Sequence, residues 1–144
     1  MKKIVFLLVC LFSMTMVKAD DGKPVEVDQL PEKARAFVTS HFKNLKVAMA
    51  KREEYFFYKS YNVVFTDGVK VEFDGSGDWT EVQCKQGEVP TQIVPKAIRD
   101  YMKTNYPDVK ILEIERDSRG YEIKLSNGME IKFDSKYRVI DIDN

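Results

Sequence analysis

The sequence predicts an α+β fold built from two tandem units, each a helix followed by a meander of antiparallel strands. A strand–turn–strand pattern occurs twice, at residues 61–82 and 121–142, and the two copies align without a gap. Apolar and charged residues alternate along these strands with a period of two. A sheet with one apolar and one charged face packs helices on the first and leaves the second in water.

The N-terminal residues 1–19 have the pattern of a secretory signal peptide. Two lysines precede an apolar run at residues 4–16, and cleavage is expected after Ala19. That run is too short to span a bilayer comfortably, so no membrane span is expected after cleavage, and the protein is expected to be periplasmic or secreted. A lipoprotein anchor at Cys10 is disfavoured because Val9 stands where a small residue is needed.

The charge of the chain gives no indication of nucleic-acid binding. Lys and Arg number 23, as do Asp and Glu. Removal of residues 1–19, which contain lysines but no acids, makes the remainder slightly acidic. Its charges are interspersed, as on a solvated surface, rather than gathered into basic blocks.

The remainder divides into a flexible lead-in at residues 20–28, a first unit at 29–86 and a second unit at 87–144. We expect each unit to begin with a helix, because Pro31 and Pro95 precede apolar residues at helical spacing. Proline is tolerated in the first turn of a helix, where its missing N–H has no partner to lose.

Each helix is expected to be followed by strands. Residues 110–116 alternate cleanly between apolar and charged side chains, and we interpret residues 46–52 as the corresponding strand of the first unit. The hairpins at 61–82 and 121–142 then contribute inward-facing apolar residues, among them Phe73 and Phe133. Asp-Gly at 67–68 and Asn-Gly at 127–128 favour two-residue turns with positive φ at both central residues.

The sequence offers little for catalysis, and we predict that the protein is not an enzyme and has no cofactor. His41 is the single histidine, so no imidazole-based metal site or catalytic pair is expected. Cys84 is the only cysteine after the signal peptide. It is interpreted as a buried apolar residue, with a thiol that pairs with a partner as the alternative.

Residues 74–78, with Glu81 beyond them, resemble the start of a calcium-binding loop. The full spacing of ligands is absent, and the corresponding residues 134–138 place cations where ligands would be needed. A glycine-rich hairpin turn explains the same residues, so no metal ligand is assigned.

One feature indicates a binding surface. Among the alternate strand residues that are expected to face outward, apolar and aromatic side chains are mixed with charged ones. Tryptophan and tyrosine in such a setting often anchor interfaces. An alternative is that Trp79 and Tyr137 cover a sheet edge or pack against a loop. The predicted protein-binding face consists of Phe56, Tyr58, Val64, Lys70, Glu72, Trp79, Glu130, Lys132, Tyr137 and Val139.

The pattern V-P-x-x-I-x-x-Y-x-x-x-x-Y-P at residues 94–107, followed by the hairpin Y-x-I…N-G-x-x-I-x-F-D, resembles the PepSY-like domains of Bacteroidetes. The resemblance covers residues 30–142. The first unit departs from it with Phe42-Lys43 in place of Tyr-Pro, and the second lacks the Gly-x-Trp of residues 77–79. Neither departure touches the core alternation.

The resemblance implies one continuous antiparallel sheet, curved across both units, with helices on its convex side, as in the beta-lactamase inhibitory protein. It also implies a non-enzymatic module that binds a protein on the open face of the sheet, with a secreted or periplasmic hydrolase or protease as the partner to be inhibited. That role is an analogy of fold. The alternative is a module that senses a small ligand or envelope stress.

Overall fold

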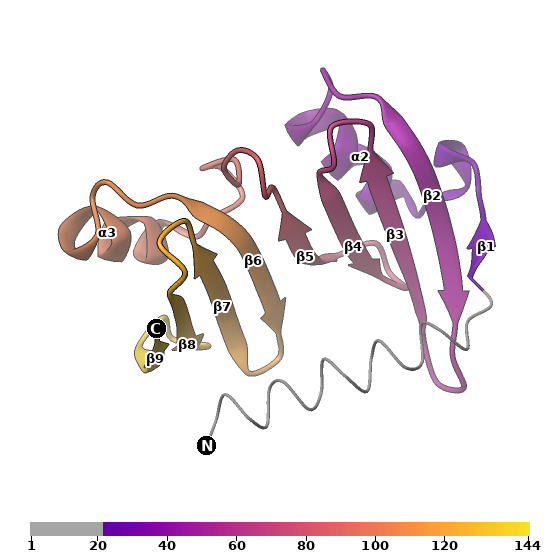
Figure 1. Ribbon diagram of the computed structural model, residues 1–144. Helices are drawn as coiled ribbons and strands as arrows, with labels where there is room; N and C mark the ends of the chain where they lie inside the picture. Colours follow the sequence, from indigo (N-terminus) through magenta and orange to yellow (C-terminus); the bar gives the residue numbers. More distant parts are fainter. Residues whose placement is uncertain (1–21) are drawn as a thin grey trace.

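The computed structural model describes residues 22–144, and the predicted signal peptide lies outside them. Their nine strands form one antiparallel sheet in which each strand pairs with the next along the chain (Figure 1). This confirms the α+β prediction at the level of a single sheet with helices. The elements are β1 (Lys23–Pro24), η1 (Val27–Gln29), α2 (Glu32–His41), β2 (Val47–Glu54), β3 (Lys59–Phe65), β4 (Lys70–Asp74), β5 (Trp79–Gln83), α3 (Lys96–Asn105), β6 (Ile111–Asp117), β7 (Gly120–Leu125), β8 (Glu130–Asp134) and β9 (Val139–Asp143).

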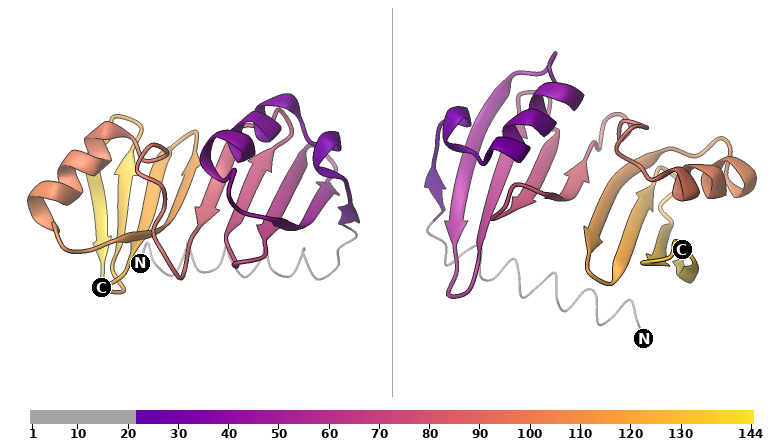
Figure 2. Two further views of the ribbon diagram at one scale, coloured as in Figure 1. Left: turned by 90° about the horizontal axis from the view of Figure 1, so that it is seen from above. Right: turned by 180° about the vertical axis from the view of Figure 1, so that it is seen from behind.

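Helices α2 and α3 lie on the same side of the sheet (Figure 2, left). The Phe37 ring of α2 meets the Phe73 ring of β4 edge-on, with centroids 5.5 Å apart. The Tyr101 ring of α3 meets the Phe133 ring of β8 in the same way, at 5.4 Å. We call this side the covered face and the other side the uncovered face. No helix among residues 22–144 is long and apolar enough to cross a membrane.

Both helices begin where the sequence predicts. Pro31 and Pro95 are the residues that precede the first helical turn. The buried side chains of α2 are Ala34 and Val38, and those of α3 are Ile98 and Met102. A spacing of four residues places each pair on one stripe of its helix, and that stripe faces the sheet.

The strand predicted at residues 46–52 is present as β2, Val47–Glu54, which pairs with β3 with one register shift between Val47 and Met49. The weak strand propensity of these residues is overridden by this pairing. The lead-in differs from the sequence-based expectation, because residues 22–29 include β1 and η1. Strand β1 pairs with β2, and the Val25 N–H donates to the Ala50 carbonyl at 3.0 Å.

The hairpin turns also differ from the prediction. Gly68 and Gly128 have positive φ (93° and 88°), but Asp67 and Asn127 do not. The Gly68 N–H donates to the Phe65 carbonyl at 2.9 Å, so the glycine comes after a tight turn rather than occupying its centre. This is the geometry of a longer hairpin loop that ends in a left-handed glycine. The predicted positive φ at the residue before each glycine was therefore wrong.

Candidate functional site

The uncovered face carries a row of glutamates on four consecutive strands. In the strand registers Glu72 of β4 lies opposite Glu81 of β5, Glu81 opposite Glu115 of β6, and Glu115 opposite Glu122 of β7. We call these four residues the glutamate row. Like charges directly opposite one another on a sheet destabilise it, so this arrangement carries a cost in the free protein.

Burial and mutual repulsion disfavour ionisation along the row. Burial, followed by the charge of Glu113, raises the pKa of Glu81 to about 7. Burial and the charges of Glu81 and Glu113 raise the pKa of Glu115 to about 8. Burial and a hydrogen bond with Glu130 raise the pKa of Glu122 to about 7. Glu81, Glu115 and Glu122 therefore change their charge close to neutral pH, and burial raises the pKa of Glu72 as well.

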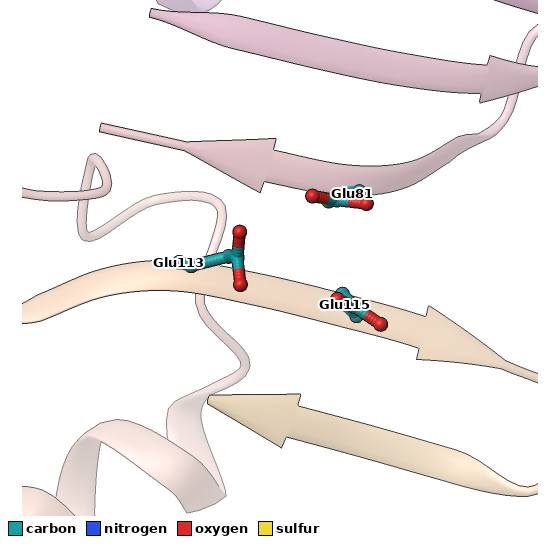
Figure 3. Close-up of side chains that lie close together, drawn as sticks. All are labelled: Glu81, Glu113 and Glu115. Carbon is teal, nitrogen blue, oxygen red and sulfur yellow. The ribbon is translucent and has the colours of Figure 1, made fainter. Parts of the chain in front are cut away.

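Three carboxylates converge where β5 meets β6. One oxygen from each of Glu81, Glu113 and Glu115 lies within 4.8 Å of the others, and all three side chains lie at the same place on the sheet (Figure 3). Glu113 is buried and forms an ion pair with Lys124, at 2.9 Å from Nζ to Oε2. Carboxylate oxygens at this spacing can reach a single hard cation such as calcium.

A shallow pocket of about 270 Å³ lies at one end of the row. Its lining includes Glu115 and Glu122 together with Lys132 of β8 and Arg119 of the β6–β7 turn. Tyr121, Phe133 and Ile140 also line it, so the pocket combines charged groups of both signs with apolar surface.

The turn between β2 and β3 presents two phenylalanines to solvent. Phe56 is 96% exposed and Phe57 is 92% exposed. Beneath them the Tyr55 and Tyr58 rings stack with centroids 4.6 Å apart. We call residues 55–58 the aromatic tip. So large an exposure of adjacent phenylalanines is unusual for a surface that stays in water.

The aromatic tip is tied to the uncovered face through Glu53. The Tyr55 hydroxyl donates to Glu53 Oε2 at 2.5 Å, and the Asn62 amide donates to Glu53 Oε1 at 2.7 Å. Asn62 lies opposite Glu72, the first member of the glutamate row. Burial, the hydrogen bond and the charge of Glu53 raise the pKa of Tyr55, so its hydroxyl stays protonated as the donor.

Half of the residues of the predicted binding face lie together on the uncovered face. Each of them lies opposite a charged residue or another member of that face on the neighbouring strand. Val64 lies opposite Lys70, and Lys132 lies opposite Glu122. Phe56 and Tyr58 belong to the aromatic tip, outside the strands. The residues on the uncovered side are Val64, Lys70, Glu72, Glu130 and Lys132.

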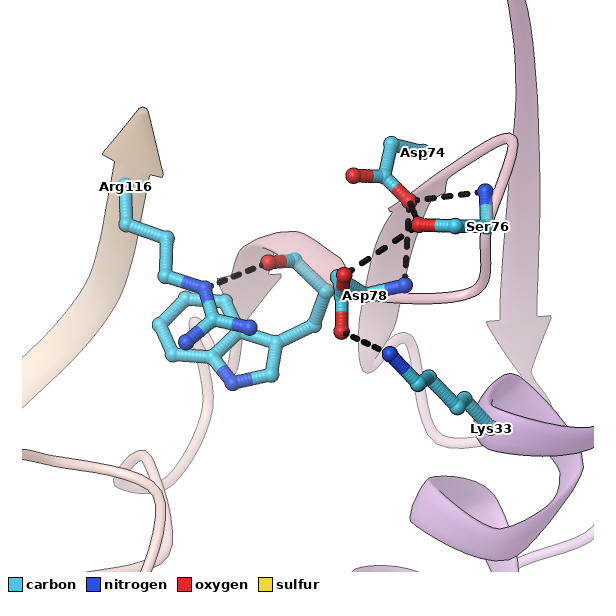
Figure 4. Close-up of polar contacts among 6 residues, drawn as sticks. Lys33, Asp74, Ser76, Asp78 and Arg116 are labelled. Atoms are coloured by element: carbon cyan, nitrogen blue, oxygen red, sulfur yellow. Dashed lines mark hydrogen bonds and ion pairs between the residues drawn. The ribbon is translucent and has the colours of Figure 1, made fainter. Parts of the chain in front are cut away.

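Trp79 lies on the covered face, which corrects its predicted placement. A register shift between Glu72 and Phe73 brings Trp79 opposite Phe73, so its side chain turns toward α2. It is only 8% exposed, and its ring lies 6.3 Å from that of Phe37. The Arg116 guanidinium lies 4.0 Å from the centre of the indole, and Arg116 Nε donates to the Trp79 carbonyl at 2.7 Å (Figure 4). Simple alternation could not reveal this shift.

The same correction applies to Val139 and Tyr137. A register shift between Lys132 and Phe133 brings Val139 opposite Phe133, on the covered face. Tyr137 stacks on Tyr121 with ring centroids 5.3 Å apart. Both remain partly exposed, because no further strand comes after β9 among residues 22–144.

The carboxylates of Asp74 and Asp78 are already occupied by protein partners (Figure 4). Asp74 Oδ1 accepts the backbone N–H groups of Ser76 and Asp78, each at 3.0 Å. Asp78 pairs with Lys33 of α2 at 3.5 Å. Asp134 accepts backbone N–H groups in the same way, which supports the turn interpretation rather than a calcium loop.

Cys84 and His41, the remaining candidates for chemistry, both pack within the fold. Cys84 is buried, and burial followed by the charge of Asp67 raises the pKa of its thiol to about 11, so it is a poor nucleophile at neutral pH. His41 packs against Phe37 at the end of α2, with ring centroids 4.7 Å apart.

Sequence reasoning missed Glu81, Glu113, Glu115 and Glu122 as site residues. The alternation did indicate that Glu113 and Glu115 face outward. Their meeting with Glu81 depends on the pairing of β5 with β6 across a connection that contains α3. No local pattern encodes that register.

Comparison with known proteins identifies the family. A family model with the description "Putative beta-lactamase-inhibitor-like, PepSY-like" matches residues 59–141. Among curated proteins, none matches the chain.

Three solved structures are similar to this chain along nearly all of their own length. A "putative periplasmic protein" of the DUF2874 family from Bacteroides vulgatus is 60% identical, with a TM-score of 0.86, over 88% of this chain and 99% of that one. A "putative calcium-regulated periplasmic protein" from Bacteroides thetaiotaomicron is 57% identical, with a TM-score of 0.85, over 88% and 99% of the two chains. A "putative periplasmic protein of unknown function", also from Bacteroides vulgatus, is 38% identical, with a TM-score of 0.81, over 86% of this chain and 100% of that one. The chain therefore belongs to the PepSY-like family.

Proposed function

We propose that the protein is a non-enzymatic periplasmic module that binds a partner protein on the uncovered face of its sheet. The observation that carries this proposal is the glutamate row. The names of its relatives, which describe periplasmic proteins, support the location. The description of the family supports a partner that is a secreted or periplasmic enzyme, such as a hydrolase or protease, held in an inhibited state.

The charge of the row specifies the chemistry of the partner. Glu72, Glu81, Glu115 and Glu122 repel one another in the free protein. Lysine or arginine side chains placed over the row would neutralise them and favour ionisation of all four. We therefore expect a partner surface that carries a cluster of basic residues, and binding that weakens as salt is added.

The aromatic tip supplies the apolar part of the interface. Phe56 and Phe57 stand almost fully exposed at the end of the β2–β3 hairpin. Burial of such rings in a pocket on the partner is the kind of contact that dominates binding energy. The tip adjoins the row through Glu53 and Asn62, so one partner can contact both.

The two halves of the chain support a tandem interpretation. Helix α2 with β2–β5 and helix α3 with β6–β9 have the same order of elements, and we infer that residues 29–86 and 87–144 are two PepSY-like units. The glutamate row then crosses the junction between the units, where β5 pairs with β6. An isolated unit would lack half of the row.

Affinity capture tests the proposal. The chain from Asp20 is immobilised and exposed to envelope and secreted proteins of the source organism, beside a Glu81→Gln, Glu115→Gln variant and a Phe56→Ser, Phe57→Ser variant. We expect a partner that the wild type retains and that both variants lose. Glu88→Gln, an exposed change in the connection after β5, is the matched control and should retain the partner.

Thermal unfolding establishes that each variant is folded. A partner retained equally by the wild type and by both variants would exclude the uncovered face as the binding surface. Capture of no partner by the wild type would contradict the function itself.

A second candidate function is calcium binding by Glu81, Glu113 and Glu115. Their converging oxygens favour it, and so does the relative from Bacteroides thetaiotaomicron that is described as calcium-regulated. Because the pKa values of Glu81 and Glu115 lie near 7 and 8, calcium competes with protons for these groups. Calorimetric titration with calcium chloride should show affinity that rises from pH 6 to pH 8. An identical titration curve for Glu81→Gln, Glu115→Gln would contradict this assignment.

A further inference from the structure

The glutamate row is a line of carboxylates with defined ends. Its members occupy directly opposite positions on β4, β5, β6 and β7. Asn62 of β3 lies opposite Glu72 and ends the row on one side. Lys132 of β8 lies opposite Glu122 and ends it on the other. Neighbouring strands lie about 4.8 Å apart, so the row extends over about 14 Å from its first carboxylate to its last.

The centre of the row lacks a cation, and one end lacks a hydrogen-bond donor. Glu81 and Glu115 form no ion pair within residues 22–144. Lys124 of the same face pairs with Glu113 instead. Glu122 is only 8% exposed and lines the pocket of about 270 Å³, and its Oε1 has no hydrogen-bond partner in the described part of the chain. A ligand that fits the row therefore supplies both positive charge and N–H donors.

We propose that the glutamate row binds a linear polyamine, such as spermine, laid across the four strands. Polyamines carry ammonium groups separated by three or four methylene groups. With single bonds of about 1.5 Å, an extended spacer of this kind places neighbouring nitrogens about 5–6 Å apart, close to one strand spacing. Spermine has four such nitrogens, as many as the row has carboxylates. Each ammonium group can therefore lie beside one carboxylate and donate to its oxygens.

The extent of the row distinguishes a polyamine from a compact cation. A metal ion reaches only carboxylates that converge, as those of Glu81, Glu113 and Glu115 do. Glu72 and Glu122 belong to β4 and β7, on either side of that centre, so one central ion cannot contact both. Burial and like charges raise the pKa values of Glu81 and Glu115 to about 7 and 8, and an ammonium group beside each would favour the ionised form.

Calorimetric titration of the chain from Asp20 with spermine at low salt tests the proposal. Hexaamminecobalt(III), whose charge is concentrated at one point, is the comparison ligand. The variant Glu72→Gln, Glu122→Gln removes the charge at both ends of the row and should weaken spermine binding by about tenfold or more. It should change the affinity for hexaamminecobalt(III) by less than about threefold. Glu88→Gln, a change of an exposed acid outside the row, should leave both affinities unchanged.

Thermal unfolding establishes that both variants are folded. Absence of spermine binding, or equal spermine affinity for the wild type and the double variant, would overturn the inference. Equal weakening of both ligands by the double variant would show a response to net charge and would overturn it too, as would a comparable loss in Glu88→Gln. The inference uses the row of the proposed function, but the titration contains no partner protein. Its failure would therefore leave the capture experiment as a separate test of that function.

Discussion

Strands β5 and β9 are the last strands of the two halves of the chain, and their local structures match. Each comes after an aspartate-centred turn, and each contains a register shift that turns its first side chain toward the covered face. Their burial differs sharply, since Trp79 and Val82 are 8% and 0% exposed whereas Val139 and Ile142 are 36% and 45% exposed. Local sequence thus determines the shape of the strand, and the neighbouring strand determines how much of it is buried.

The largest loss of stability is expected from phenylalanines that the two halves bury equally well. Phe73 and Phe133 are both completely buried in the covered face, each against an aromatic ring of its helix. Phe73→Ala and Phe133→Ala should each cost about 3–5 kcal/mol, measured by urea unfolding. A loss below about 1 kcal/mol for either would show that the two halves do not share one packing scheme.

The last strands should respond unequally to truncation. Val82→Ala removes buried methyl groups and should cost about 2–3 kcal/mol. Ile142→Ala removes more atoms but from a half-exposed side chain, and should cost less than about 1 kcal/mol. Equal losses in urea unfolding would imply that β9 is covered in solution, for example by a second copy.

The turns before β5 and β9 offer a second contrast. Gly77 and Tyr137 both have positive φ, at 93° and 64°. A Cβ on Gly77 would lie 2.9 Å from Cβ of Pro31, so Gly77→Ala combines backbone strain with a clash and should cost about 2 kcal/mol.

Tyr137→Gly is the matched change in the second half. It relieves a left-handed conformation but loses the stacking on Tyr121, so the two effects nearly cancel and stability should change by less than about 0.5 kcal/mol. Thermal unfolding of both variants checks the contrast. A loss for Tyr137→Gly as large as that for Gly77→Ala would show that the stacked tyrosines support the fold.

The last contrast depends on pH and concerns the uncovered face. Strand register equates Glu115 with Lys51 of the first half, since Ile114 and Ala50 lie opposite corresponding residues, Ile123 and Val63. The pKa of Glu115 is raised to about 8 in the folded protein, well above that of a free glutamate. The folded state therefore holds an extra proton between those two pKa values, and stability falls as pH rises through this interval.

Glu115→Gln should remove this part of the pH dependence. The variant should be more stable than the wild type by about 1–2 kcal/mol at pH 8 and equal to it near pH 4. Urea unfolding at a series of pH values measures the difference. Parallel pH profiles for the two proteins would show that Glu115 ionises normally in the fold.

The elements of this fold were predictable from sequence because their signals are local. Alternation of apolar and charged residues identified the strands of both hairpins, and Pro31 and Pro95 marked the starts of the helices. The family pattern at residues 94–107 then indicated a sheet with helices on one face. The predicted binding face was only partly correct. Alternation assigns Val64, Lys70 and Glu72 to the right face of the sheet, but it assigns the wrong face to residues that follow a register shift.

The sequence alone therefore determined helices α2 and α3, strands β2–β9, the hairpin positions and the outward direction of most charged side chains, since each depends on residues close in the chain. Tertiary structure decided two things. It turned Trp79 inward, because a single extra residue in one strand of a pair reverses the face to which the next side chains point. It also assembled the glutamate row, because the pairing of β5 with β6 joins segments separated by a helix, and that long-range register depends on how the whole sheet packs.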